Sequence, residues 1–280
     1  MKTISFVNMK GGVAKTTLSV NLADALNRRA DKRVLLIDID PQFNATQCIY
    51  GGEEYVKQRT AGGHTIVNIY DDTGQTKVSP VKGAQAPAPI KLEDVQPWKI
   101  RNGFEIIPGD LELYRLDGTA GQGREQRLKR YLEKSKATEK YDYVIIDTPP
   151  TPSSWMMSAL IASDHYVIPV KAEPLSRVGI DLLQGVVNRC SENFGHDIGC
   201  LGVVLTLTDR RTKTYADTIE WLDKNNLWKD RRFGFSLPQR TAIARDQGDQ
   251  KLILDSNATE TKTALVQIMN EFLKRLNDAN

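Results

Sequence analysis

Near the start of the chain, a short run of small, basic and hydroxylated residues has the spacing of a phosphate-binding loop. Gly11 and Gly12 let the backbone approach an anion closely, and a helix beginning after them would present free N–H groups and the positive end of its dipole. Lys15 can reach the β- and γ-phosphates of a nucleotide, the Thr16 hydroxyl can ligate Mg²⁺, and Thr17 is placed to bond the α-phosphate. These residues predict a site for a nucleoside triphosphate with magnesium.

The loop departs from the common phosphate-loop pattern, G-x-x-x-x-G-K-[ST]. Met9 and Ala14 occupy its two glycine positions, and Val13 precedes Ala14. The context is nevertheless the expected one, because an apolar strand-like run at residues 2–8 precedes the loop and a helical apolar pattern follows it. A strand, a loop and a helix in this order favour phosphate binding over a chance match.

Three aspartates stand where two aliphatic runs end. Residues 33–39 (RVLLIDI) lead to Asp38 and Asp40, and a second run leads to Asp147. Near-continuous aliphatic runs are typical of central parallel strands, and ligands bind at the carboxyl edge of such sheets. Asp38 and Asp40 would share one face of their strand, because residues two apart point the same way. Lys171 and Glu173 follow another strand at this edge; we expect an ordinary ion pair there, with nucleotide sensing as the alternative.

The rest of the chain alternates predicted strands and helices. Strand-like runs lie at residues 2–8, 33–39, 104–107, 143–147, 166–170, 201–207 and 233–237. Helical apolar patterns lie at residues 18–26, 124–137, 153–162, 178–194, 212–225 and 261–276. This alternation predicts an α/β fold, a single doubly wound, mostly parallel sheet flanked by helices. We expect one domain over residues 1–280, with a surface insertion at about residues 72–97 that is rich in Pro, Gly and Gln.

The composition excludes several other classes of protein. The 280 residues carry a net charge of +3, and no apolar run approaches the ~20 residues of a membrane span. The three cysteines and three histidines are scattered, so we expect neither a disulfide framework nor a structural metal site, and a reducing compartment is the default. A phosphate loop beginning at about residue 8 leaves no room for a signal peptide.

Three ordered motifs resemble those of the ParA/MinD family of P-loop ATPases. KGGVAKTT is similar to the family's deviant Walker motif K-G-G-x-x-K-[ST]-T. LLIDIDPQFNAT is similar to its second signature, and YDYVIIDTPPTPSS to its Walker-B strand and switch II. The resemblance continues through VIPVKAE and SLPQR, and it covers nearly the whole chain outside residues 72–97. It implies a P-loop fold and slow ATP hydrolysis with Mg²⁺ as cofactor.

The resemblance also implies roles for individual residues. Lys10 matches the lysine that crosses the dimer interface to the other subunit's ATP, which makes the dimer depend on ATP. Lys15 and Asp40 complete the expected catalytic set, with Asp40 orienting the attacking water. Thr16, Asp38 and Asp147 form the expected magnesium set, with Asp147 acting through water and Asp38 also supporting the switch region.

The resemblance further places the nucleotide and marks one departure. The phosphates would lie against residues 10–17, that is Lys10, Gly11, Gly12, Val13, Ala14, Lys15, Thr16 and Thr17. Pro238 and Arg240 of SLPQR match a loop that contacts the base in relatives. Phe43 stands where the family commonly has glycine, so we expect its ring to alter switch I and the rate of hydrolysis.

Four functions fit parts of this pattern. A ParA-like ATPase would dimerise on ATP, bind DNA without sequence preference and be triggered to hydrolyse ATP by a ParB-like or adaptor protein, positioning or partitioning plasmid, chromosome or other cargo. A MinD-like protein would need a membrane-seeking tail, whereas burial explains the last helical pattern better, so no membrane is expected. An electron-transfer ATPase would need a cysteine pair that residues 50–189 lack. A metabolic P-loop enzyme would need a further catalytic constellation, and the sequence offers no activated Ser or Cys and no His at ligand spacing.

The first function gains support from basic residues in the C-terminal half, which could line a composite surface in a dimer. They are Arg210, Arg211, Lys213, Lys229, Arg231, Arg232, Arg240, Arg245 and Lys251. A protein of this kind would be cytoplasmic and nucleoid-associated. No N-terminal helix-turn-helix domain is expected, because the chain starts directly at the first strand-like run. The MinD-like and metabolic functions remain the alternatives.

Overall fold

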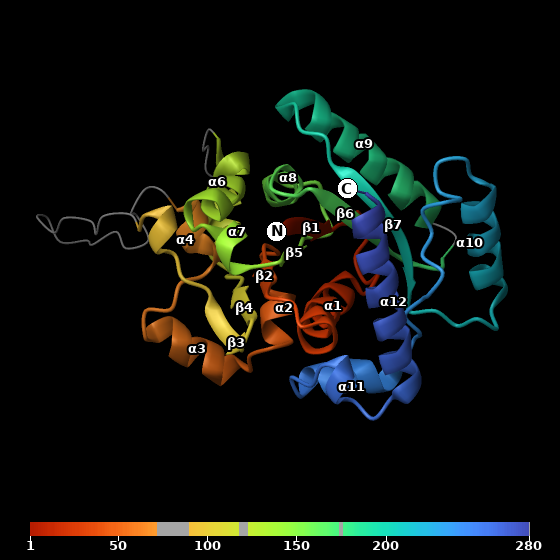
Figure 1. Cartoon of the computed structure of the whole chain (residues 1–280), viewed down its shortest axis with the longest axis horizontal. Helices are drawn as coiled ribbons and strands as arrows, with labels where there is room; N and C mark the ends of the chain where they lie inside the picture. Colours follow the sequence, from red (N-terminus) through yellow and green to blue (C-terminus); the bar gives the residue numbers. More distant parts are fainter. Residues whose placement is uncertain (72–89, 118–122, 174–175, 280) are drawn as a thin grey trace, which may run out of the picture.

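A mostly parallel sheet organises the chain (Figure 1). The computed structural model describes residues 1–71, 90–117, 123–173 and 176–279. Within these residues, seven strands form one sheet in the order β3-β4-β2-β5-β1-β6-β7, and every neighbouring pair except β3 and β4 is parallel. The strands are β1 (Lys2–Phe6), β2 (Val34–Asp38), β3 (Trp98–Arg101), β4 (Phe104–Ile107), β5 (Tyr143–Asp147), β6 (His165–Lys171) and β7 (Gly199–Thr206). The predicted doubly wound α/β fold is confirmed.

Helices cover both faces of the sheet. They are α1 (Lys15–Ala30), α2 (Asn44–Gln47), α3 (Gly52–Thr60), α4 (Ile66–Tyr70), α5 (Leu113–Asp117), α6 (Arg127–Lys134), α7 (Ala137–Lys140), α8 (Ser154–Ile161), α9 (Ser176–Phe194), α10 (Lys213–Lys224), α11 (Thr241–Gly248) and α12 (Thr259–Asp278). Helices α1 and α12 lie side by side on one face, while α6, α8 and α9 lie on the other (Figure 1). The strands are therefore buried on two sides.

Strand β2 shows why this sequence gives a central strand. All five of its residues are fully buried, in the pattern expected of a strand between two layers of helices. Leu36 packs with α1 and α12 in one apolar cluster, whereas Leu35 and Ile37 pack in the cluster on the other face. Because successive side chains alternate between faces, an unbroken aliphatic run is needed to fill both cores.

One predicted strand is wrong. Residues 233–237 form no strand; instead they run along the edge of β7 with isolated bridges at Arg232 and Pro238. The Phe233 amide donates to the Val203 carbonyl at 2.9 Å, and the Leu237 amide donates to the Leu205 carbonyl at 2.9 Å. Between these two bonds the segment leaves the ladder, so its apolar residues reach the core without continuous pairing.

The predicted helix at residues 124–137 is interrupted. A 3-10 turn at Arg124–Gln126 leads into α6, and α7 begins only after Lys136, whose backbone has φ 56°. A left-handed residue cannot continue a right-handed helix, so the direction of the chain changes there. Of the predicted insertion at 72–97, residues 72–89 lie outside the described part. The remainder is anchored, since Leu92 and Val95 are buried in the core.

Candidate nucleotide site

The predicted phosphate loop connects β1 to α1 at the carboxyl edge of the sheet. Hydrogen bonds from neighbouring strands hold it. The Thr206 hydroxyl at the end of β7 donates to the Val13 carbonyl at 2.7 Å, and the Asn8 amide group donates to the Pro169 carbonyl of β6 at 2.6 Å. The backbone turns into α1 at Ala14, which has φ 55° and ψ 33°. Alanine thus occupies a left-handed position that favours glycine, the residue found there in the common pattern.

Lys15 is buried at the base of this loop, with 7% of its surface exposed. Burial lowers the pKa of its ammonium group, and the carboxylates of Asp147 and Asp40 oppose that shift. A cation removed from water in this way gains strongly from a bound anion, because the interaction is less screened than at the surface. The position suits a lysine that holds phosphate.

Asp147 lies beneath the loop and is fully buried. The Thr16 hydroxyl donates to its Oδ2 at 2.7 Å and the Ser19 hydroxyl to its Oδ1 at 3.0 Å. Burial raises the pKa of Asp147 to about 6, although Lys15 and these hydroxyl donors lower it. The predicted magnesium residues Thr16 and Asp147 are therefore in direct contact. Ser19 was not predicted; its place one helical turn after Thr16 is the only sequence signal for it.

Asp38 holds the start of switch I, the segment that follows β2. It pairs with Asp147 in the β2–β5 register, and its Oδ2 accepts both the Thr46 amide and the Thr46 hydroxyl at 2.8 Å. The same hydroxyl accepts the Gly109 amide at 2.8 Å. Burial raises the pKa of Asp38 well above its usual range, with further contributions from Asp147 and Asp40. Thr46, which no sequence pattern singles out, joins this carboxylate to a residue far along the chain.

Asp40 lines the same cleft as the loop. This cleft has a volume of about 880 Å³, and residues 10–17 form one wall of it. Asp40 is 5% exposed, and its Oδ1 accepts the Gln42 amide at 2.9 Å. Lys10, Lys15 and Asp40, the predicted catalytic set, therefore all face one space.

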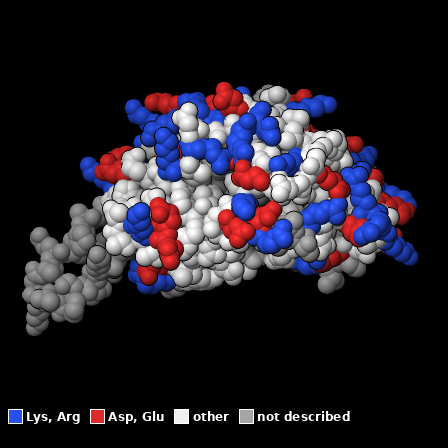
Figure 2. All heavy atoms as spheres, turned by 90° about the horizontal axis from the view of Figure 1, so that it is seen from below, with Lys and Arg blue, Asp and Glu red and all other residues white. Residues whose placement is uncertain are grey.

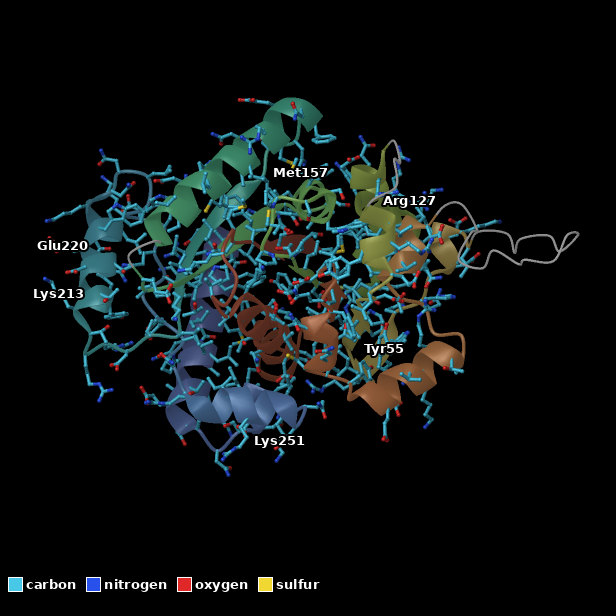
Figure 3. The ribbon with its side chains drawn as sticks, turned by 180° about the vertical axis from the view of Figure 1, so that it is seen from behind. Tyr55, Arg127, Met157, Lys213, Glu220 and Lys251 are labelled. Atoms are coloured by element: carbon cyan, nitrogen blue, oxygen red, sulfur yellow. The ribbon has the colours of Figure 1, made fainter. Side chains whose placement is uncertain are left out.

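Phe43 is one of three aromatic residues that line the cleft. The backbone of Phe43 has φ 42° and ψ 39°, a left-handed conformation that favours glycine. Tyr55 of α3 also lines the cleft (Figure 3). A side chain on Gly109 would meet the Phe43 Cβ at 2.5 Å. The residue that departs from the family pattern thus sits in the conformation that glycine would adopt.

The side chain of Lys10 points toward the residues that follow β6. Its ammonium group forms an ion pair with Glu173, and Lys171 binds the other carboxylate oxygen of Glu173. The expected ion pair between Lys171 and Glu173 is present, and Lys10 joins it as a third charged group. Hydrogen bonds from these two lysines hold the pKa of Glu173 below its usual range.

Pro238 and Arg240 lie in a different pocket. With Thr208, Asp209 and Glu260 they line a polar pocket of about 870 Å³, and none of the phosphate-loop residues is among its lining residues. Arg240 forms an ion pair with Glu260. The end of β7 contacts both segments, because the Thr206 hydroxyl donates to the phosphate loop and the Thr208 amide donates to the carbonyl of Leu237, which precedes Pro238, at 3.1 Å.

The donor atoms fit a nucleotide with magnesium. Mg²⁺ prefers oxygen ligands and is usually bound through one or two carboxylates together with substrate phosphates. The Thr16 hydroxyl and the Asp147 carboxylate supply such oxygens, next to a buried lysine and a helix N-terminus. In the described part of the chain, no group of three His, Cys, Asp or Glu side chains is arranged to hold a metal ion.

Comparison with known proteins identifies the family. A family model described as an AAA domain matches residues 1–199. The sporulation initiation inhibitor protein Soj of Bacillus subtilis is 34% identical over 254 residues, which cover 90% of this chain and 90% of Soj. The chromosome partitioning protein ParA of Caulobacter vibrioides is 28% identical over 285 residues, 99% of this chain and 96% of that protein.

Solved structures share the fold. A protein of Borrelia burgdorferi B31 described as a plasmid partition protein, bound to AMPPNP, superposes with a TM-score of 0.76 at 22% identity and covers 98% of this chain and 99% of its own. Cobyrinic acid a,c-diamide synthase of Mycobacterium smegmatis, bound to an ATP analogue and magnesium, gives a TM-score of 0.67 at 22% identity and covers 100% of this chain and 97% of its own. The fold therefore accommodates ATP analogues and Mg²⁺ in other proteins.

Proposed function

Since the chain belongs to the ParA/MinD family of P-loop ATPases, among the ParA/Soj-like partition proteins, we propose that it is an ATPase whose ATP-bound dimer positions DNA or another cargo. The observation that carries this proposal is the contact of Thr16 with Asp147 beside the buried Lys15. This arrangement supplies a cation, a hydroxyl and a carboxylate where the phosphates and magnesium of ATP would lie. ATP and Mg²⁺ are the proposed cofactors.

The phosphate-loop residues and the three aspartates have distinct roles in the proposed reaction. The backbone of residues 11–14 and the amides that begin α1 bind the phosphates, Lys15 neutralises their charge, and Thr17 bonds the α-phosphate. Thr16 and Asp147 would hold Mg²⁺, which neutralises charge on the phosphate oxygens. Asp38 fixes switch I through Thr46, and Asp40 orients the attacking water in the cleft.

Lys10 makes the dimer depend on ATP. Two nucleotides facing each other concentrate negative charge, and a lysine from each partner offsets it. Light scattering after size exclusion tests this: the protein is expected to be dimeric with a non-hydrolysable ATP analogue and monomeric with ADP. A monomer in every nucleotide state would contradict the sandwich.

Two variants separate binding from hydrolysis. Lys15→Ala is expected to lose nucleotide affinity, because the buried cation is removed from the phosphate loop. Asp40→Ala is expected to bind ATP and accumulate as the dimer, because only the positioning of water is lost. Binding of a fluorescent ATP analogue and phosphate release measure the two steps, and hydrolysis by Asp40→Ala at the wild-type rate would refute the role of Asp40. Wild-type hydrolysis should be slow and should rise with a partner protein.

Non-specific DNA binding is proposed for the dimer. Figure 2 shows Lys and Arg spread over one face of the molecule with Asp and Glu among them. Of the basic residues proposed from the sequence, Arg211, Arg232, Arg240 and Arg245 have acidic partners. In the described part of the chain no ion pair involves Arg210 or Lys213, and Lys213 lies on α10 (Figure 3). Among the described residues Lys229, Arg231 and Lys251 form no ion pair either, but Arg210 and Lys213 are both exposed and lie three positions apart, so we choose this pair for the test.

The DNA test compares two double variants. Arg210→Glu with Lys213→Glu is expected to weaken ATP-dependent duplex binding while leaving ATP affinity intact. Lys129→Glu with Arg130→Glu on α6 is the matched control for charge. Wild-type affinity should fall by orders of magnitude between about 50 and 200 mM salt and change little with DNA sequence. Equal loss in both double variants would refute the chosen site.

Membrane association is the alternative that the same assay addresses. The apolar face of α12, which a membrane-seeking helix would need, is buried, including Leu265, Phe272 and Leu276. None of the described helices is long and apolar enough to span a membrane. From its membership among the ParA/Soj-like proteins, we propose a cytoplasmic, nucleoid-associated protein with a ParB-like or adaptor partner. Binding to anionic liposomes rather than DNA would favour a MinD-like function, and high constitutive ATP turnover would favour a metabolic enzyme.

A further inference from the structure

Lys10 has a carboxylate partner within its own chain. Its ammonium group binds one carboxylate oxygen of Glu173, and Lys171 binds the other. All three side chains are about one-third exposed, so the cluster lies at the protein surface. Lys10 also lines the cleft that the phosphates would occupy. The ammonium group of Lys10 is therefore bound to Glu173 of its own chain and also borders the cleft at the proposed dimer interface.

The backbone before Lys10 directs it toward this carboxylate. The Lys10 amide donates to the side-chain oxygen of Asn8 at 2.9 Å, and the nitrogen of the same Asn8 side chain donates to the Pro169 carbonyl at 2.6 Å. Pro169 belongs to β6, the strand that ends at Lys171 and leads to Glu173. Asn8 thus ties the start of the phosphate loop to the strand that leads to Glu173.

We propose that Glu173 holds Lys10 within its own protomer and that dimer formation must exchange this carboxylate for the phosphates of the partner's ATP. The proposal rests on the ATP-dependent dimer proposed above. Lys10 cannot bind both anions at full strength, so each protomer gives up one ion pair when the dimer forms. Lys171 keeps Glu173 partnered after the exchange, which makes the release of Lys10 less costly.

This competition sets the threshold for dimerisation. Partly exposed ion pairs contribute modestly, and two of them are lost per dimer, so removing Glu173 should raise the dimerisation constant by roughly 2- to 30-fold. Removing Lys171 should do the opposite, because Glu173 would then be neutralised by Lys10 alone and would hold it more tightly. Glu173 is a positioning residue in this scheme, acting through Lys10 rather than on the nucleotide.

The test measures dimerisation by analytical ultracentrifugation at saturating AMPPNP. Glu173→Gln is expected to strengthen the dimer and Lys171→Gln to weaken it. Glu192→Gln, the same charge change at an exposed position near the end of α9, controls for net charge and should match the wild type. A dimer that is unchanged or weakened in Glu173→Gln would overturn the proposal.

A second readout separates this proposal from the proposed function. In nucleotide-free protein, amine labelling followed by peptide mass spectrometry should modify Lys10 several-fold faster in Glu173→Gln than in the wild type. This measurement needs no dimer, so it stands even if the protein never dimerises. Equal labelling of Lys10 in the two proteins would refute the ion pair, whereas a wild type that is monomeric with AMPPNP would refute the ATP-dependent dimer instead.

Discussion

The ring of Phe43 stacks on the ring of Tyr55, with centroids 5.3 Å apart and planes inclined by 25°. This contact fastens switch I to α3, because Phe43 precedes α2 and Tyr55 lies in α3. It also offsets an unfavourable backbone, since Phe43 has φ 42°. A left-handed residue other than glycine costs about 1–2 kcal/mol, and an aromatic pair contributes about 0.5–1.5 kcal/mol beyond the burial of its area.

Replacing Phe43 separates these two effects. Phe43→Ala loses the stack and keeps the strained backbone, whereas Phe43→Gly loses the stack and relieves the strain. After the extra freedom of glycine in the unfolded chain is subtracted, Phe43→Gly should be about 0.5–1 kcal/mol more stable than Phe43→Ala. Urea unfolding measures the difference. A glycine variant less stable than the alanine variant would show that the backbone at this position is not strained.

Thr46 should be essential to switch I. Thr46→Val keeps the shape of the side chain but removes the hydroxyl that binds Asp38 and accepts the Gly109 amide. Because buried polar groups are left without a partner, a loss of about 1–3 kcal/mol in the free energy of unfolding is expected. Thr46→Ser retains the hydroxyl and serves as the control, so a valine variant as stable as the serine variant would contradict this role.

The cysteines should be unreactive in the folded protein. Burial raises the pKa of all three thiols, and it raises that of Cys48 to about 12, with Asp147 and Asp38 contributing. Only the thiolate reacts with disulfide reagents, so at pH 8 little reagent should be consumed. Titration with a chromogenic disulfide should show fast reaction only after unfolding. Rapid labelling of Cys48 in native protein would contradict this expectation.

Acid should destabilise the fold partly through His165. Burial lowers the pKa of His165, with Lys2 as a further cause, and its Nδ1 has no hydrogen-bond partner among the residues that the structure describes. The folded state therefore resists a proton that the unfolded state takes up below about pH 6.5, so this contribution to stability is present at neutral pH and is lost as the pH falls. Thermal unfolding from pH 7 to pH 5 should show a shallower decline in His165→Asn than in the wild type. If the stability of the two proteins declined identically with pH, His165 would not contribute to the loss of stability in acid.

The sequence allowed the fold and the centre of the site to be predicted because their signals are local. Buried parallel strands need unbroken aliphatic runs, and a phosphate loop needs its glycines and lysine in order. Helix α3 has no such pattern in its sequence, because none of its residues is buried and it therefore needs no apolar face. Strand β3 was missed although Asn102 and Gly103, a typical hairpin turn with φ 72° at Gly103, stand between it and β4.

The parts of the site that were missed depend on contacts between distant residues. Ser19 meets Asp147 across 128 positions, and Thr46 meets Gly109 across 63. Neither spacing follows from a local pattern, because the strand order of the sheet decides which segments become neighbours. The ion pair of Lys10 with Glu173 is of the same kind, joining two strand ends 163 positions apart.

The segment that runs beside β7 closes one side of the sheet. Strand β7 is an edge strand, and an uncovered edge is a template on which another chain can add a strand and aggregate. Here the Val203 amide donates to the Arg231 carbonyl at 2.8 Å, and the amides of Phe233 and Leu237 donate back to β7. The segment at residues 231–238 therefore pairs with some backbone groups of β7, although it is itself no regular strand to which another strand could be added. The covered edge thereby guards the chain against strand-to-strand aggregation, a form of association that the hydrolysis proposed above would not reverse.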